Sequence, residues 1–115
     1  MIKAISLAYR KPGLTREEFS KYWLETHGPM AAKGFPGLRK YVQNHFIYVP
    51  GHEVEGDGIV EMWYDDIKAW EYSMQFMQTP EGRYLAQDGD KFSIMKGQGP
   101  WIVEEHIIKD DIAKK

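Results

Sequence analysis

The sequence contains no cysteine, which excludes disulfides, thiolate catalysis, cysteine-ligated zinc and iron–sulfur clusters. It also has no surplus of positive charge: 15 Lys and Arg stand against 17 Asp and Glu, which argues against a nucleic-acid partner. No stretch approaches the roughly 18 consecutive apolar residues of a membrane span, and the N-terminus lacks a signal-peptide pattern. We therefore expect a soluble cytoplasmic protein with neither a nucleic-acid nor a membrane partner.

Motifs for nucleotide and hydrolase chemistry are missing as well. There is no Gly-rich dinucleotide or P-loop fingerprint and no Gly-x-Ser-x-Gly elbow. The four histidines lack the spacing of a dedicated zinc site. Any chemistry is therefore expected to use His, Tyr and carboxylate side chains, with no cofactor and no metal.

The 115 residues that are present suit one folded domain. An apolar fraction of 43% and an aromatic fraction of 14% predict a globular chain with a single core. We expect this domain to span residues 1–109 and the charged segment 110–115 to be a frayed tail.

The first predicted helix runs from Arg16 to His27. Thr15 and Glu18 fit a capping box at its start, and the Gly28-Pro29 pair is expected to stop it. Its regular spacing places three side chains on one face: Phe19, Trp23 and His27.

Alternation and turn residues predict the other elements. They are strand 2–9, strand 38–49, polar connection 51–58, strand 59–64, a helix from about 67 to 77 capped by Asp65 or Asp66, a shorter helix from Pro80, a break at 97–100 and strand 101–108. The order β-α-β-β-α-(α)-β predicts an α+β, ferredoxin-like fold, with an antiparallel four-stranded sheet and helices on one face only.

The strand patterns also assign side chains to the two faces of this sheet. The expected helix-facing positions are Ile5, Leu7, Val42, Phe46, Val60, Met62, Val103 and Ile107. The opposite face then carries Ala4, Ser6, Ala8, Tyr41, Gln43, His45, Ile59, Glu61, Trp63, Glu104 and His106. Because that face is too apolar to stay bare and too polar for a plain core, we expect a second copy to cover it around a ligand-filled space.

Five blocks of the sequence resemble a known family. They are Phe19-x-x-Tyr22-Trp23-x-x-x-His27-Gly28-Pro29, Pro36-Gly37-Leu38-Arg39-x-Tyr41-Val42-Gln43-Asn44-His45, Asp57-Gly58-x-x-Glu61-x-Trp63, Asp88-x-x-x-Phe92 and Glu105-His106. Together they resemble the EthD family of the dimeric α/β-barrel superfamily. The resemblance implies a homodimer. It also carries the family's recurrent His and Tyr onto His27 and Tyr41.

Relatives in that family include a methylmuconolactone isomerase and polyketide dehydratases or cyclases, and more distant members are monooxygenases. The isomerase is associated with cysteines that this chain lacks. The resemblance thus implies His, Tyr and carboxylate chemistry on a small molecule.

His27 is the first candidate catalytic residue, because His is the usual acid or base at neutral pH. The alternative is a helix-terminal His that caps the last carbonyls. Tyr41 and His45 are expected to project from one strand face with Gln43 between them, where they can share one small substrate. The alternative for this pair is a dimer contact.

The remaining candidates are expected to bind substrate or support the site. Glu61 is expected to pair with His45 or His106, or to act as a base. Asp88 is expected to have a hydrogen-bonding role. An apolar pocket for an aromatic ligand is expected from Trp23, Trp63, Phe92 and Tyr41, although each also fits a core position.

These features predict a homodimeric, cofactor-independent enzyme that moves protons on a small apolar carbonyl, lactone or polyketide-like compound, as an isomerase, dehydratase or cyclase. A non-catalytic accessory protein of an oxidoreductase system and a monooxygenase are the alternatives.

Overall fold

The structure, a computed structural model, describes residues 1–94, 96 and 99–112. Its elements in chain order are β1 (Ile2–Arg10), α1 (Arg16–Tyr22), the π-helix η1 (Trp23–His27), α2 (Gly28–Gly34), β2 (Lys40–His45), β3 (Gly58–Tyr64), α3 (Ile67–Phe76), α4 (Arg83–Phe92), β4 (Ser93–Ile94) and β5 (Trp101–Val103). The strands form an antiparallel sheet in the order β2-β3-β1, and both β4 and β5 pair with the far edge of β1.

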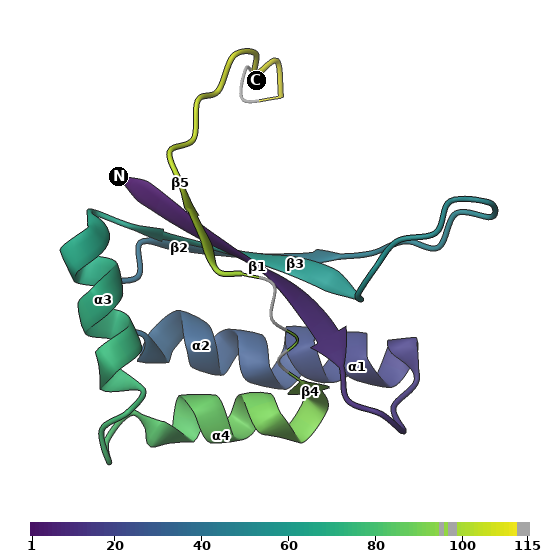
Figure 1. The fold of residues 1–115 in the computed structure, drawn as a ribbon, viewed down its shortest axis with the longest axis horizontal. Helices are drawn as coiled ribbons and strands as arrows, with labels where there is room; N and C mark the ends of the chain where they lie inside the picture. Colours follow the sequence, from purple (N-terminus) through teal and green to yellow (C-terminus); the bar gives the residue numbers. More distant parts are fainter. Residues whose placement is uncertain (95, 97–98, 113–115) are drawn as a thin grey trace.

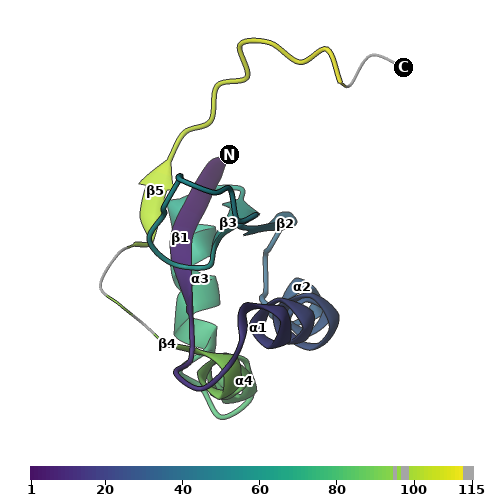
Figure 2. The same cartoon turned by 90° about the vertical axis from the view of Figure 1, so that its right-hand side faces the viewer.

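The helices lie on one side of this sheet (Figures 1 and 2). The continuous rod of α1, η1 and α2 runs beneath the sheet, with α4 beside it. This arrangement confirms the predicted α+β, ferredoxin-like fold with its antiparallel sheet. Over the described residues the sheet has five strands instead of the predicted four, because β4 also pairs with β1. None of the helices in the described ranges is long and apolar enough to cross a membrane.

The first helix begins as predicted but does not end as predicted. The Thr15 hydroxyl accepts from the Glu18 backbone N–H at 3.1 Å, and the Glu18 carboxylate accepts from the Thr15 N–H at 2.8 Å. The expected stop at Gly28-Pro29 is wrong, because the chain passes through a π-helix and continues as α2 to Gly34. Proline is tolerated there because it stands in the first turn of α2, where a backbone N–H is dispensable.

Other boundaries moved by a few residues. The strand expected over 38–49 ends at His45, and the segment 46–57 forms a projecting loop (Figure 1). Asp66, rather than Asp65, caps α3 by accepting from the Ala69 N–H at 2.8 Å. The helix expected from Pro80 begins at Arg83, and the last strand ends at Val103 instead of 108. Within the predicted break and tail, residues 97–98 and 113–115 lie outside the described residues.

The predicted faces of β1 and β2 are exchanged in the structure. Ala4 lies opposite Met62, which in turn lies opposite Tyr41, so these side chains share one face. That face meets the helices, because Gln43 and His45 contact Trp23 from η1. Ile5, Leu7 and Val42 therefore lie on the open face with Ile59, Glu61 and Trp63. Val103, which pairs with Lys3, lies there too.

The reason for the exchange is that the helices supply the bulk of the core. Phe19, Trp23 and Phe92 form a buried aromatic cluster, with centroid separations of 5.3 Å and 5.4 Å from Phe19 to the other two. Small sheet residues make room for these rings: a Cβ at Gly58 would lie 2.6 Å from Trp23 Cζ3. The small side chains of β1 thus face the core, and its large ones face outward.

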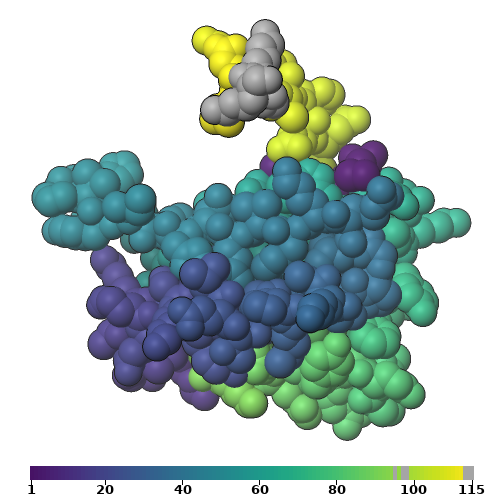
Figure 3. All heavy atoms as spheres, turned by 180° about the vertical axis from the view of Figure 1, so that it is seen from behind, coloured from purple at the N-terminus to yellow at the C-terminus, as the bar shows by residue number. Residues whose placement is uncertain are grey.

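Beyond β5, Glu105 still bonds to Lys3 and Trp63 on the sheet, and residues 106–112 form an arm that stands away from the body (Figure 3). Ile107, Ile108 and Ile112 on this arm are exposed. Ile107 therefore does not face the helices as predicted, since it lies on the arm rather than in the last strand.

Candidate functional site

The most organised polar cluster joins η1 to α4. The buried Asp88 carboxylate accepts two hydrogen bonds, from the Tyr22 hydroxyl to Oδ1 at 2.6 Å and from His27 Nδ1 to Oδ2 at 2.8 Å. The His27 ring also packs on Phe92 at 4.9 Å. Asp88 thus has the hydrogen-bonding role expected from sequence, and His27 is held on two sides.

The charge state of Asp88 determines which nitrogen of His27 carries the proton. Burial alone would raise the pKa of Asp88, but the hydrogen bonds from Tyr22 and His27 outweigh it and lower the pKa. An ionised carboxylate only accepts, so Nδ1 of His27 must be protonated. Nε2 then carries the lone pair of the neutral ring, and no described residue hydrogen-bonds to it.

Tyr22 serves as a permanent donor in this cluster. Its hydrogen bond to Asp88, together with burial and the Asp88 charge, raises its pKa to about 12. The phenol therefore stays protonated over the whole physiological range. The cluster is a dyad of an acid and an imidazole with a fixed second donor, an arrangement that can support general acid–base chemistry at Nε2.

A second polar group lies at the edge of the sheet. Tyr41, Gln43 and His45 share one face of β2, as predicted, and line an open groove of about 310 Å³. Apolar residues of the helical rod complete the groove: Leu24, Gly28, Pro29 and Ala32. The groove can accept a small ligand with an apolar body and one or two polar groups.

Gln43 fixes the hydrogen-bonding roles of its neighbours. Its Nε2 donates to the Trp23 carbonyl at 2.8 Å and to the Tyr41 oxygen at 3.2 Å, so its Oε1 is left to accept from His45 Nε2 at 2.7 Å. His45 is therefore protonated at Nε2, and its Nδ1 is the basic atom when the ring is neutral. Burial lowers the pKa of His45 and raises that of Tyr41.

The structure separates the three predicted catalytic residues into two groups. Among the described residues, no hydrogen bond or ring contact joins His27 to Tyr41 or His45. His27 contacts α4, whereas Tyr41 and His45 contact Gln43 and Trp23. His27 and the Tyr41–His45 pair therefore belong to two separate hydrogen-bonding groups.

Glu61 and Trp63 belong to a charge network on the open face. The buried Lys3 ammonium donates to Glu61 at 2.7 Å and to Glu105 at 2.9 Å. Trp63 donates to Glu105 and lies between the ammonium groups of Lys3 and Lys40, at 4.8 Å and 4.7 Å from its ring. The prediction that Glu61 pairs with a histidine is wrong, because its carboxylate pairs with Lys3 and accepts from Asn44.

The four aromatic residues expected to line a pocket do not lie together in the structure. Trp23 and Phe92 are buried in the core, whereas Trp63 lies on the open face and Tyr41 in the edge groove. The arm residue His106 is exposed, and its Nε2 lies 3.6 Å from a carboxylate oxygen of Glu104. The large rings of this chain thus mainly hold the fold together.

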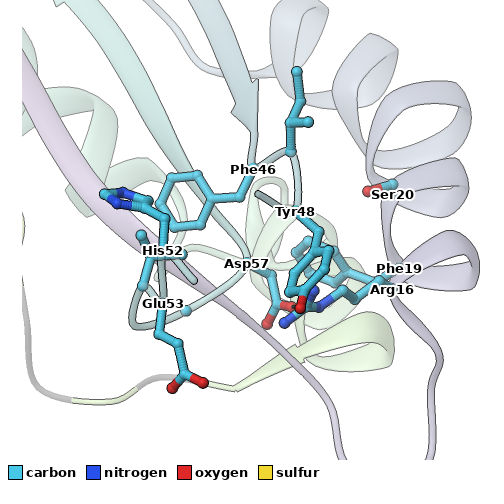
Figure 4. Close-up of a pocket in the computed structure, with 11 residues that line it drawn as sticks. Arg16, Phe19, Ser20, Phe46, Tyr48, His52, Glu53 and Asp57 are labelled. Atoms are coloured by element: carbon cyan, nitrogen blue, oxygen red, sulfur yellow. Dashed lines mark ion pairs between the residues drawn. The ribbon is translucent and has the colours of Figure 1, made fainter. Parts of the chain in front are cut away.

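A smaller cavity of about 190 Å³ lies between α1 and the loop 46–57 (Figure 4). Phe19 and Phe46 contribute apolar surface, and Arg16 pairs with Asp57 across it at 3.9 Å. Asp57 also pairs with Arg10 and accepts from its backbone N–H. These contacts tie the base of the loop to β1 and α1. In the part of the chain that the structure describes, no three His or acidic residues are grouped to hold a metal ion.

Two side chains of these polar clusters, Tyr22 and Lys3, were not among the site residues predicted from the sequence. Tyr22 was not chosen because positions 22 and 27 lie about 140° apart on a regular α-helix. Lys3 was not chosen because a lysine in a strand is usually solvent-exposed, whereas this one is 8% exposed. The Gly28-Pro29 pair directly after His27 was the one signal of an irregular helix at this point.

Comparison with known proteins agrees with the fold. An EthD family protein from Bacillus halodurans C-125 is 30% identical over 92% of this chain and 99% of its own, with a TM-score of 0.67. A dimeric protein of ferredoxin-like fold from Bacteroides fragilis is 13% identical over 90% and 95%, with a TM-score of 0.60. SnoaB, a cofactor-independent oxygenase from Streptomyces nogalater, is 10% identical over 94% and 97%, with a TM-score of 0.56.

The last two likenesses establish the fold alone. No curated protein matches the sequence. The model of the EthD domain matches residues 11–94, a range that includes His27, the edge groove and Asp88. The chain therefore belongs to the EthD domain family.

Proposed function

We propose that this protein is a cytoplasmic, homodimeric and cofactor-independent enzyme that moves protons on a small apolar carbonyl, lactone or polyketide-like compound. The supporting observation is the His27–Asp88 dyad: a buried carboxylate holds Nδ1 at 2.8 Å, and Nε2 has no partner among the described residues. The corresponding reaction is an isomerisation, dehydration or cyclisation.

In this proposal the neutral imidazole of His27 is the base. Nε2 takes a proton from the carbon next to the substrate carbonyl, which leaves an enolate and an imidazolium. The Asp88 carboxylate stabilises that imidazolium through the Nδ1 hydrogen bond. Return of the proton to a different carbon completes an isomerisation, and its transfer to a departing hydroxyl completes a dehydration.

Tyr41 and His45 are a second candidate pair. His45 is largely neutral at pH 7 because burial lowers its pKa, and its Nδ1 is free of partners among the described residues. Tyr41 stays protonated because burial raises its pKa. We propose that this pair binds a substrate hydroxyl or carbonyl in the edge groove, with Gln43 setting its orientation.

The homodimer is proposed from the open face of the sheet. Ile5, Leu7 and Ile59 lie half-buried on the sheet face that no described helix covers, and Trp101 at the sheet edge is 44% exposed. A second copy packed on this face would remove these apolar side chains from water. Light scattering on the purified chain is expected to give a dimer, and Ile5→Asp a monomer. A monomeric parent protein would contradict this part of the proposal.

The test of function is deuterium exchange, because it needs no knowledge of the product. The protein is incubated in D2O with a panel of aryl ketones, 1,3-diketones and unsaturated lactones, and mass spectrometry measures deuterium at the carbon next to the carbonyl. Exchange is expected with at least one compound. It should fall about 10²–10⁴-fold in His27→Gln, with His106→Gln on the exposed arm as the matched control.

The rival functions give other outcomes in the same experiment. Binding of these compounds without exchange would indicate an accessory protein that holds a ligand. Oxygen consumption with an aromatic phenol or quinol would indicate a cofactor-free oxygenase, the activity named for the SnoaB neighbour. Exchange that persists in His27→Gln but is lost in His45→Gln would move the chemistry to the edge groove.

A further inference from the structure

The wide turn between Tyr22 and His27 is what brings both side chains to Asp88. In η1 the Gly28 N–H bonds to the Trp23 carbonyl five residues back, instead of four. On a regular α-helix, residues five positions apart point about 140° away from each other. The extra residue in the turn reduces that angle, and the two side chains then bond to the two oxygens of one carboxylate.

The carbonyl that closes this turn has a second donor from the sheet. Gln43 on β2 donates its Nε2 to the Trp23 oxygen at 2.8 Å. Gly28 permits this approach, because a Cβ there would lie 2.7 Å from Gln43 Nε2 and 3.0 Å from the Trp23 oxygen. The sheet thus holds the π-turn at the carbonyl that accepts from Gly28 at its end.

Both N–H groups and the oxygen of the Gln43 amide make hydrogen bonds within the protein. Its two N–H groups bond to Trp23 and Tyr41, and its carbonyl accepts from His45. These three contacts hold the side chain in one rotamer and one flip state. The amide also links the edge groove to the dyad, since it touches the ligand-facing side chains on one side and the π-turn on the other.

We propose that Gln43 is a positioning residue for His27: its amide holds the Trp23 carbonyl in the π-turn, and the π-turn presents His27 to Asp88. The proposal rests on the proposed function only in making His27 the proton-transfer group. A competing explanation is that Pro29 alone imposes the π-turn, because proline has no N–H for the usual helical bond. In that case Gln43 would be dispensable.

The test compares Gln43→Leu with Asn44→Leu. Asn44 is the neighbouring amide on the opposite face of β2, where it donates to the Ile59 carbonyl and to Glu61. The readout is the ¹H–¹⁵N NMR signature of the His27 ring in the full chain, assigned with His27→Gln. In Gln43→Leu we expect the hydrogen-bonded Nδ1–H signal to disappear or move to that of a free histidine. Asn44→Leu should keep it.

A second pair of variants tests the proposal if Gln43→Leu does not fold. Gln43→Glu keeps the size of the side chain but turns an oxygen toward the Trp23 carbonyl, and Gly28→Ala pushes the Gln43 amide away from it. Both should weaken the same His27 signal. An unchanged signal in the folded Gln43 variants would overturn the proposal and leave Pro29 as the cause of the turn.

The same variants separate this proposal from the function it rests on. If His27 is the base, Gln43→Leu should slow deuterium exchange about 100-fold, the effect of a misplaced catalytic group. If His27→Gln exchanges at the parent rate, His27 is not the proton-transfer group of the proposed function, yet the NMR result still decides the role of Gln43. An unchanged NMR signal contradicts that role whatever the exchange rates are.

Discussion

Replacing Asp88 by asparagine is the sharpest perturbation of the dyad. Asparagine has nearly the same shape, but it offers one accepting oxygen where Asp88 offers two, at 2.6 Å and 2.8 Å from its donors. Either Tyr22 or His27 then faces an N–H group. If His27 does, its ring must accept at Nδ1 and carry the proton on Nε2. In that orientation the variant removes the base without removing the imidazole.

The energetic cost follows from the two hydrogen bonds. A hydrogen bond to an ionised group contributes roughly 1.5–3 kcal/mol, and one of the two is lost outright. A neutral amide is easier to bury than a carboxylate, which offsets part of that loss. We expect the free energy of unfolding to fall by about 1–2 kcal/mol and Tm by about 5–10 °C. Exchange at the substrate carbon should fall about 10²–10⁴-fold.

Thermal denaturation and the deuterium-exchange assay measure both effects. Asp90→Asn is the matched control, because Asp90 lies on the same helix with an exposed side chain. It should leave Tm and exchange unchanged. An Asp88→Asn protein as stable and as active as Asp90→Asn would refute the dyad.

Three further predictions concern pH and packing. Because the pKa of Asp88 is lowered on folding, the ionised carboxylate stabilises the fold above about pH 5, and this stabilisation is lost as the pH falls through the native pKa. When Tm is measured from pH 6 to 3, it should therefore fall less steeply in Asp88→Asn than in the parent protein. Parallel curves for the two proteins would contradict this. Gly58→Ala should lower the free energy of unfolding by about 1–3 kcal/mol, since its methyl would lie 2.5 Å from the Asn44 carbonyl oxygen and 2.6 Å from Trp23. An unchanged urea midpoint would contradict this prediction. Gly89→Ala should raise the free energy of unfolding by about 0.5–1 kcal/mol, because α4 loses a flexible residue and the new Cβ has room, 4.0 Å from the His27 ring. A lower urea midpoint in this variant would contradict the prediction.

Local signals in the sequence were sufficient for the fold. The Thr15–Glu18 capping box and the strand alternation gave the element order, because each depends on residues close together in the chain. The hairpin of β2 and β3 followed from the polar segment between them. These are short-range effects that a single sequence carries in full.

The faces of the sheet were harder to predict from the sequence, because they depend on which elements pack against the sheet. The alternation of Ile5 and Leu7 with Ala4 and Ser6 shows that β1 has two different faces, but not which one meets the helices. The volume of the Phe19, Trp23 and Phe92 side chains decides which face of β1 meets the helices. The space that they fill is known only once the helices are placed against the sheet.

The candidate site was predicted in its parts but not in its connections. His27 and Asp88 were both selected, yet their pairing across 61 positions follows from the packing of η1 on α4. Tyr22 joins them only because of the π-turn, which departs from the regular helical period on which the prediction relied. Irregular backbone at a candidate site is thus where pattern reasoning fails first.

The central claim is that Asp88 fixes His27 with its proton on Nδ1 and a basic Nε2 available for substrate. The ¹⁵N NMR shifts of the His27 ring at neutral pH and above test it directly. The account predicts a protonated, hydrogen-bonded Nδ1 and an unprotonated Nε2 in the neutral ring. A neutral ring protonated at Nε2, or the tautomer mixture of a free histidine, would contradict it.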